Sequence, residues 1–170
     1  MKSYRNLEKA PRGIRNNNPG NLRVGSNWQG SIPTVQVPEK AFVTFQNYAY
    51  GVRAMLLLLL NKHKSGQKTV RQLISSWAPP TENDTNSYVK FVAKGLGVEP
   101  DTTLNLDKTT LFKLASSIVQ KENGTKWKLE TSDFEDAFSL LAQKVRPAAA
   151  VAAGASFGVL ALVISYFILK

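Results

Sequence analysis

The apolar and polar positions of this chain follow two different periods. From residue 48 onward, apolar residues recur at the three- and four-residue spacing of amphipathic helices. The pattern predicts one helix over 48–64, a second from Thr69 to the proline pair at 79–80, and three more within 81–97, 106–124 and 132–145. Residues 13–47 instead hold short apolar or alternating runs between glycine, proline and asparagine. These runs predict short strands at 21–24, 34–37 and 41–45.

These elements predict an α+β fold that is mainly helical, with a small β-rich region. The apolar run at 54–60 is too short to cross a bilayer and is typical of a buried core helix. Residues 148–169 are different, because they contain no charged residue and lie between basic flanks. Since about 20 apolar residues span a bilayer core, they predict a C-terminal transmembrane helix. The predicted organisation is a basic arm over 1–12, a domain over 13–146 and an anchor over 147–170.

One polar residue continues the apolar stripe of the helix predicted over 106–124. Glu122 lies about 20° around the helix axis from Leu111, so it faces the core or a cleft beside it. Partial burial and the negative end of the helix dipole both favour its protonated form. Such an acid can donate a proton to a leaving glycosidic oxygen. The alternative is a solvated glutamate at a fraying helix end, beside Lys121.

Composition limits the chemistry further. The chain has no cysteine and one histidine, His63, so we expect no disulfide, no thiol nucleophile, no metal site and no cofactor. Lys and Arg number 22 against 12 Asp and Glu, a net charge of +10. This charge favours polyanions such as anionic headgroups, an acidic cell wall or nucleic acid. Few basic clusters are interleaved with aromatic residues, so we do not expect a nucleic-acid partner.

Several motifs occur in an ordered set: RGIRNNNPGNLR at 12–23, WQG at 28–30, F..F at 42–45, GVRA at 51–54 and WAPPTENDTNSYV at 77–89. Together they resemble a family of phage and prophage virion proteins that are similar to lysozyme-like lytic enzymes. The resemblance covers about residues 12–124. It implies a lysozyme-like domain that opens peptidoglycan as the phage enters its host. In the looser similarity to flagellar-type glucosaminidases and transglycosylases, the glutamate helix comes first. Here it comes last, which implies a circular permutation.

The resemblance also implies roles for individual residues. Glu122 would be the catalytic acid, and the hydroxyl of Tyr88 would help to stabilise the sugar transition state. Glycan binding is predicted for Asn17, Asn18, Asn21, Trp28 and Asn83. For the asparagines of the turn, the alternative is that they tie the turn to its own backbone. For Trp28 and Tyr88 the alternative is packing in the core.

The number of carboxylates distinguishes two reactions. A two-carboxylate hydrolase needs a second acid, for which Glu39 and Glu82 are the candidates. A lytic transglycosylase needs only one glutamate, because the 6-hydroxyl of the sugar attacks and leaves a 1,6-anhydro end. Glu39 is the only acid between Gly13 and Gln46, and this scarcity favours the transglycosylase.

The sequence therefore predicts a membrane-anchored virion enzyme that cleaves the MurNAc–GlcNAc β-1,4 bond. Its expected partners are peptidoglycan glycan strands, a lipid membrane contacted through residues 148–169, and other membrane or capsid proteins of the virion. It would lie in a virion membrane, and in the host membrane during assembly. One alternative is a non-enzymatic, membrane-bound virion structural protein with the same fold. Another is a basic protein that links viral DNA to membrane.

Overall fold

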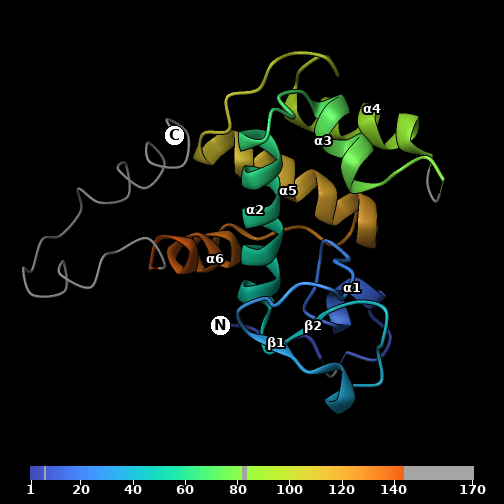
Figure 1. Ribbon diagram of the computed structural model, residues 1–170, viewed down its shortest axis with the longest axis vertical. Coiled ribbons are helices and arrows are strands. Elements are labelled where there is room, and N and C mark those ends of the chain that lie inside the picture. The colour runs from blue at the N-terminus through green and yellow to red at the C-terminus, as the bar shows by residue number, and fades with distance from the viewer. Residues whose placement is uncertain (6, 82–83, 144–170) are drawn as a thin grey trace, which may run out of the picture.

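The computed structural model describes residues 1–5, 7–81 and 84–143 (Figure 1). The helices are α1 (Arg12–Arg15), α2 (Tyr48–Lys64), α3 (Val70–Trp77), α4 (Thr85–Leu96), α5 (Lys108–Asn123) and α6 (Thr131–Gln143). The strands are β1 (Ser31–Ile32) and β2 (Thr44–Phe45), with a 3-10 helix, η1 (Thr34–Gln36), between them. Figure 1 shows α2 at the centre, with α1 and the two strands near the end where α2 begins.

The predicted helices correspond to α2–α6, and local side chains cap the N-terminal ends of α2–α5. Thr69 forms a capping box with Gln72 at the start of α3. Asp84 accepts a hydrogen bond from the backbone of Ser87 at the start of α4, and Asp107 does the same for Thr110 at the start of α5. Because these caps are local sequence signals, the helix starts predicted from the sequence lie close to the observed ones.

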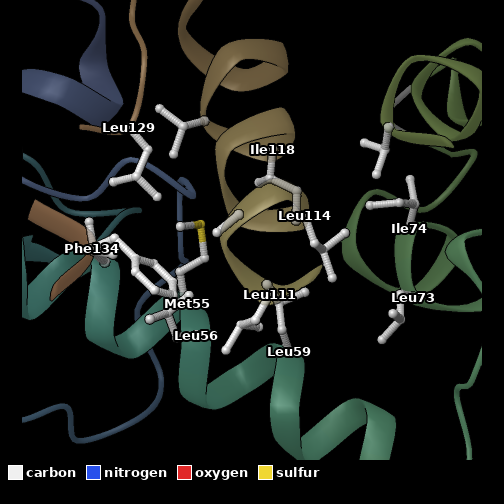
Figure 2. Packing of buried hydrophobic residues seen from close by; sticks show 14 of the residues in the cluster. Met55, Leu56, Leu59, Leu73, Ile74, Leu111, Leu114, Ile118, Leu129 and Phe134 are labelled. Atoms are coloured by element: carbon white, nitrogen blue, oxygen red, sulfur yellow. The ribbon is translucent and has the colours of Figure 1, made fainter. Parts of the chain in front are cut away.

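The core lies where α2 crosses α5. Met55, Leu56 and Leu59 of α2 are fully buried, which confirms the predicted core helix. Figure 2 shows them among the side chains of Leu73, Ile74, Leu111, Leu114, Ile118, Leu129 and Phe134. A second, smaller cluster of Leu22, Val43, Phe45 and Ala54 joins the β region to α2. The core therefore fixes α5 against α2, and the β region beside both.

The β region is smaller than predicted. β1 and β2 form one antiparallel pair, with Ser31 opposite Phe45. Residues 34–36 form η1 instead of a strand, after Pro33, whose ring fixes φ near −65° and favours a turn. Residues 21–24 contribute only an isolated bridge between Arg23 and Phe42.

The predicted fold class also included a transmembrane helix, and this needs correction. Within the described residues, no helix is long and apolar enough to cross a membrane. The longest of them, α2, has 17 residues and contains Arg53, Lys62 and Lys64. The helix predicted over 148–169 lies outside the described residues. The structure therefore supports a mostly helical domain with a two-stranded sheet.

The first residues, predicted as an arm, pack on the domain. The Lys2 carbonyl accepts a hydrogen bond from the Tyr48 amide at 2.9 Å. The Lys2 ammonium lies 3.2 Å from the carboxylate of Asp133. The Tyr4 ring packs edge-on against Tyr48. These contacts hold the N-terminal segment between α2 and α6.

Candidate active site

The end of α5 is fixed to the asparagine-rich turn at 16–21. Asn123 is the last residue of α5, and Gly124 ends the helix with a φ of 91°. The buried side-chain amide of Asn123 donates to the Pro19 carbonyl at 2.8 Å and to the Val119 carbonyl at 2.9 Å. Gly13 lies so close that an added Cβ would collide with Asn123 Oδ1. This contact sets the position of Glu122 relative to the turn.

Glu122 lies half-buried between two side chains from distant parts of the chain. The Tyr88 hydroxyl donates to Oε1 at 2.9 Å, and the Asn21 amide donates to Oε2 at 2.8 Å. These partners belong to α4 and to the turn after α1. The structure thus brings together the glutamate, the tyrosine and the turn that the motif resemblance placed in one site.

Tyr88 is well suited to donate a hydrogen bond here. Its side chain is 3% exposed. Burial, and then the negative charge of Glu122, raise the pKa of Tyr88 well above its usual range. The hydroxyl therefore keeps its proton across the physiological pH range. Tyr88 contacts both the core of α4 and the glutamate, so the two alternatives for this residue are not exclusive.

The three asparagines of the turn that were predicted to bind glycan have different surroundings. The side-chain amide of Asn17 bonds to Ser3 Oγ and the Phe45 carbonyl, and that of Asn18 bonds to the carbonyls of Leu22 and Val43. Both residues are fully buried. The bond from Asn18 to Leu22 ties the turn to its own backbone, as the alternative predicted, whereas the other bonds reach separate segments of the chain. Asn21 is half-buried and points to Glu122.

The backbone conformation of two asparagines sets the orientation of this turn. Asn17 and Asn21 have φ values of 51° and 49°, in the left-handed region that asparagine tolerates better than most residues. At Gly51 of α2, an added Cβ would collide with the carbonyl of Asn17. The turn therefore packs directly on the backbone of α2, and Asn21 is held facing α5.

The remaining predicted residues lie elsewhere. Trp28 is half-buried and packs against the smaller core cluster, as its structural alternative predicted. Glu39 accepts hydrogen bonds from the backbone amides of Ala41 at 2.9 Å and Phe42 at 3.3 Å. These backbone amides, with a contribution from Arg12, lower the pKa of Glu39. Glu82 and Asn83 lie outside the described residues.

Two residues of the site were not among those predicted from the sequence. One is Asn123, which joins α5 to the turn. Arg12 lies with its guanidinium carbon 3.5 Å from the centre of the Phe42 ring, and its Nε is 3.5 Å from Asn21 Oδ1. Its place at the head of the RGIRNNNPGNLR motif was the available signal.

A second cation contacts a residue of the site. Lys121 lies 5.8 Å from the centre of the Tyr88 ring and donates to Ser87 Oγ at 3.2 Å. It adds positive charge beside Tyr88, the residue that donates to Glu122. Within the described residues, no group of three or more histidine, aspartate or glutamate side chains is placed to hold a metal ion.

No protein-family model matches the chain. The chain is 34% identical over 124 residues to protein P5 of Pseudoalteromonas phage PM2. The matched region covers 70% of this chain and 75% of the phage protein. The chain therefore belongs to the family of phage protein P5. The relative's name states no activity.

Proposed function

We propose that this phage protein is a virion-associated glycosidase that cleaves peptidoglycan, with Glu122 as its acid. The observation that carries the proposal is the pair of hydrogen bonds from Tyr88 and Asn21 to the two carboxylate oxygens of Glu122. Two side chains from separate segments converge on the carboxyl group of one half-buried glutamate. This is how a group that transfers a proton is held in place.

The reaction we propose needs only this one carboxyl group. Glu122 protonates the glycosidic oxygen between MurNAc and GlcNAc, and the bond from that oxygen to the anomeric carbon breaks. The resulting carboxylate then takes the proton of the MurNAc 6-hydroxyl, whose oxygen bonds to the anomeric carbon. The products are a 1,6-anhydro end and a new GlcNAc end. No water molecule is consumed in this transglycosylase route.

Glu39 supports the one-carboxylate route over a hydrolase. Its Oε1 accepts hydrogen bonds from two backbone amides of its own loop, so this oxygen is already engaged and is not free to hold a water molecule or attack a sugar. A glutamate held in this way acts as a cap for its own loop. The hydrolase route would need a different second acid.

The proposed roles of the partners follow from their chemistry. Tyr88 keeps its proton, so it donates to Glu122 whenever the carboxylate is charged. Asn21 orients the same carboxyl group through Oε2. As positive charge develops on the sugar ring, the Tyr88 oxygen offers a nearby dipole. The relative from phage PM2 supports a location in the virion, where the enzyme would act on the host wall during infection.

Zymography with the purified full-length chain tests this proposal. We expect the wild type to clear a gel that contains peptidoglycan, and Glu122→Gln to lose this clearing. The matched control is Glu99→Gln, because Glu99 is an exposed glutamate that is not a hydrogen-bond partner of Glu122. Clearing by Glu122→Gln would refute the assignment of the acid. Absence of clearing by the wild type would favour a non-enzymatic virion protein.

Mass spectrometry of the released muropeptides tests the reaction type. The transglycosylase route gives 1,6-anhydro ends, whereas a hydrolase gives reducing ends. Reducing ends alone would refute the one-carboxylate mechanism and leave the glycosidase proposal standing.

A further inference from the structure

An exposed arginine lies beside the candidate acid and is already oriented. Arg12 is exposed on α1, yet its guanidinium stacks on the face of Phe42 with 3.5 Å between the guanidinium carbon and the ring centre. Its Nε lies 3.5 Å from Asn21 Oδ1. The amide of Asn21 therefore bridges Arg12 and Glu122, since its nitrogen donates to Glu122 at 2.8 Å.

The outer edge of this guanidinium has unused hydrogen-bonding capacity. Within the described residues, Nε makes the hydrogen bond of Arg12, and the two Nη atoms make none. Glu39 is close enough to interact electrostatically with Arg12 but does not form an ion pair with it. A stacked guanidinium loses less side-chain freedom on binding, and its planar edge fits a carboxylate through two parallel hydrogen bonds.

We propose that Arg12, supported by Phe42 and Asn21, forms a subsite for a carboxylate carried by the sugar next to the cleaved bond. The subsite deepens the proposed function and rests on it, because it defines the substrate class as an acidic saccharide. The carboxylate would come from the lactyl group of an N-acetylmuramic acid residue or from a peptide attached to it.

Charges of both signs surround the subsite. The carboxylate of Glu39 repels an incoming anion, whereas Arg23, whose guanidinium carbon lies 5.0 Å from the centre of the same Phe42 ring, attracts one. A singly charged carboxylate meets less of this repulsion than a phosphate dianion does. The subsite is therefore expected to prefer carboxylates to phosphate.

Paired ligands test the proposal without any cleavage. N-acetylmuramic acid and N-acetylglucosamine differ only by the lactyl group with its carboxylate. Ligand-observed NMR titrations of the full-length wild type are expected to show about tenfold tighter binding of N-acetylmuramic acid, the range for a charge-assisted contact at a partly exposed site. Muramyl dipeptide, as a third ligand, shows whether a peptide carboxylate serves instead. Inorganic phosphate is expected to compete poorly.

Matched variants link this preference to the site. Arg12→Gln is expected to abolish the preference for the acidic sugar and to leave binding of N-acetylglucosamine unchanged. Arg12→Lys keeps the charge but not the planar edge, so part of the preference should remain. Arg15→Gln is the control with the same loss of charge, because Arg15 lies on the same short helix and bonds to the Ala10 carbonyl. It should retain the full preference.

Three results would overturn the subsite: no preference in the wild type, a preference that survives Arg12→Gln, or an equal loss in Arg15→Gln. These results are distinct from failure of the proposed function. If the wild type does not clear peptidoglycan but shows an Arg12-dependent preference, the enzyme proposal fails and the subsite stands. If clearing depends on Glu122 and no preference is found, the subsite fails and the enzyme stands.

Discussion

Replacement of Tyr88 by phenylalanine removes one hydroxyl from the centre of the candidate site and keeps the ring that packs in the core. The hydroxyl lies 2.9 Å from Oε1 of Glu122, and the tyrosine side chain is 3% exposed. A hydrogen bond to a charged group contributes about 1.5–3 kcal/mol. Because Glu122 is only half-buried, we expect Tyr88→Phe to lower the free energy of unfolding by about 1.5–2 kcal/mol, at the lower end of this range.

A double-mutant cycle isolates this contact from other effects of the two substitutions. Urea denaturation of the wild type, Tyr88→Phe, Glu122→Gln and the double variant gives the coupling energy, which we expect to be about 1 kcal/mol. Tyr50→Phe is the control, because Tyr50 is a half-buried tyrosine whose hydroxyl makes no hydrogen bond within the described residues. It should change the free energy of unfolding only slightly.

If the proposed function is correct, Tyr88→Phe should also cleave peptidoglycan more slowly than the wild type. Loss of about 1.4 kcal/mol of interaction with the carboxyl group lowers the rate about tenfold. A coupling energy indistinguishable from zero would mean that Tyr88 and Glu122 do not interact in solution. In that case the geometric basis of the proposed site would be refuted, whatever the zymogram shows.

Two further predictions address the support of the site and its pH dependence. Asn123→Ala removes the hydrogen bonds to the carbonyls of Pro19 and Val119, so urea denaturation should show a free energy of unfolding lower by about 1–3 kcal/mol. The control Asn105→Ala replaces an exposed asparagine and should change this free energy little. Burial, the largest effect, and nearby Lys68 lower the pKa of His63 below its usual 6.5. The unfolded chain therefore binds this proton more readily, so stability should be lost as the pH falls through about 6.5 and level off below the folded pKa. His63→Gln should remove this part of the pH dependence, and an unchanged slope would contradict it.

The helices were predictable from the sequence because their signals are local. The stripe of Leu111 and Ile118 defines α5, and a capping box at Thr69 starts α3. Gly97, with a φ of 74°, ends α4. Each signal depends on residues within one or two turns of helix, so no knowledge of the rest of the chain was needed.

The strands were less predictable because their pairing depends on distant residues. The run at 34–37 has an alternating pattern, but Pro33 precedes it and no partner strand lies beside it, so η1 forms there. Strand pairing is set between 31–32 and 44–45, across a loop. The alternation in the sequence could not reveal which run would find a partner.

The sequence by itself determined the helices, their caps and the helical phase that places Glu122 on the apolar stripe of α5. Only the tertiary structure decided which side chains meet that glutamate. Asn21 is 101 positions earlier and Tyr88 is 34 positions earlier, and packing of α5 against α4 and the turn brings them together. The structure also distinguishes Asn21, whose side chain bonds to Glu122, from Asn17 and Asn18. The side chains of Asn17 and Asn18 are buried and bond to backbone carbonyls of the domain. These three asparagines share one motif, and their burial depends on α2 and β2, which lie later in the chain.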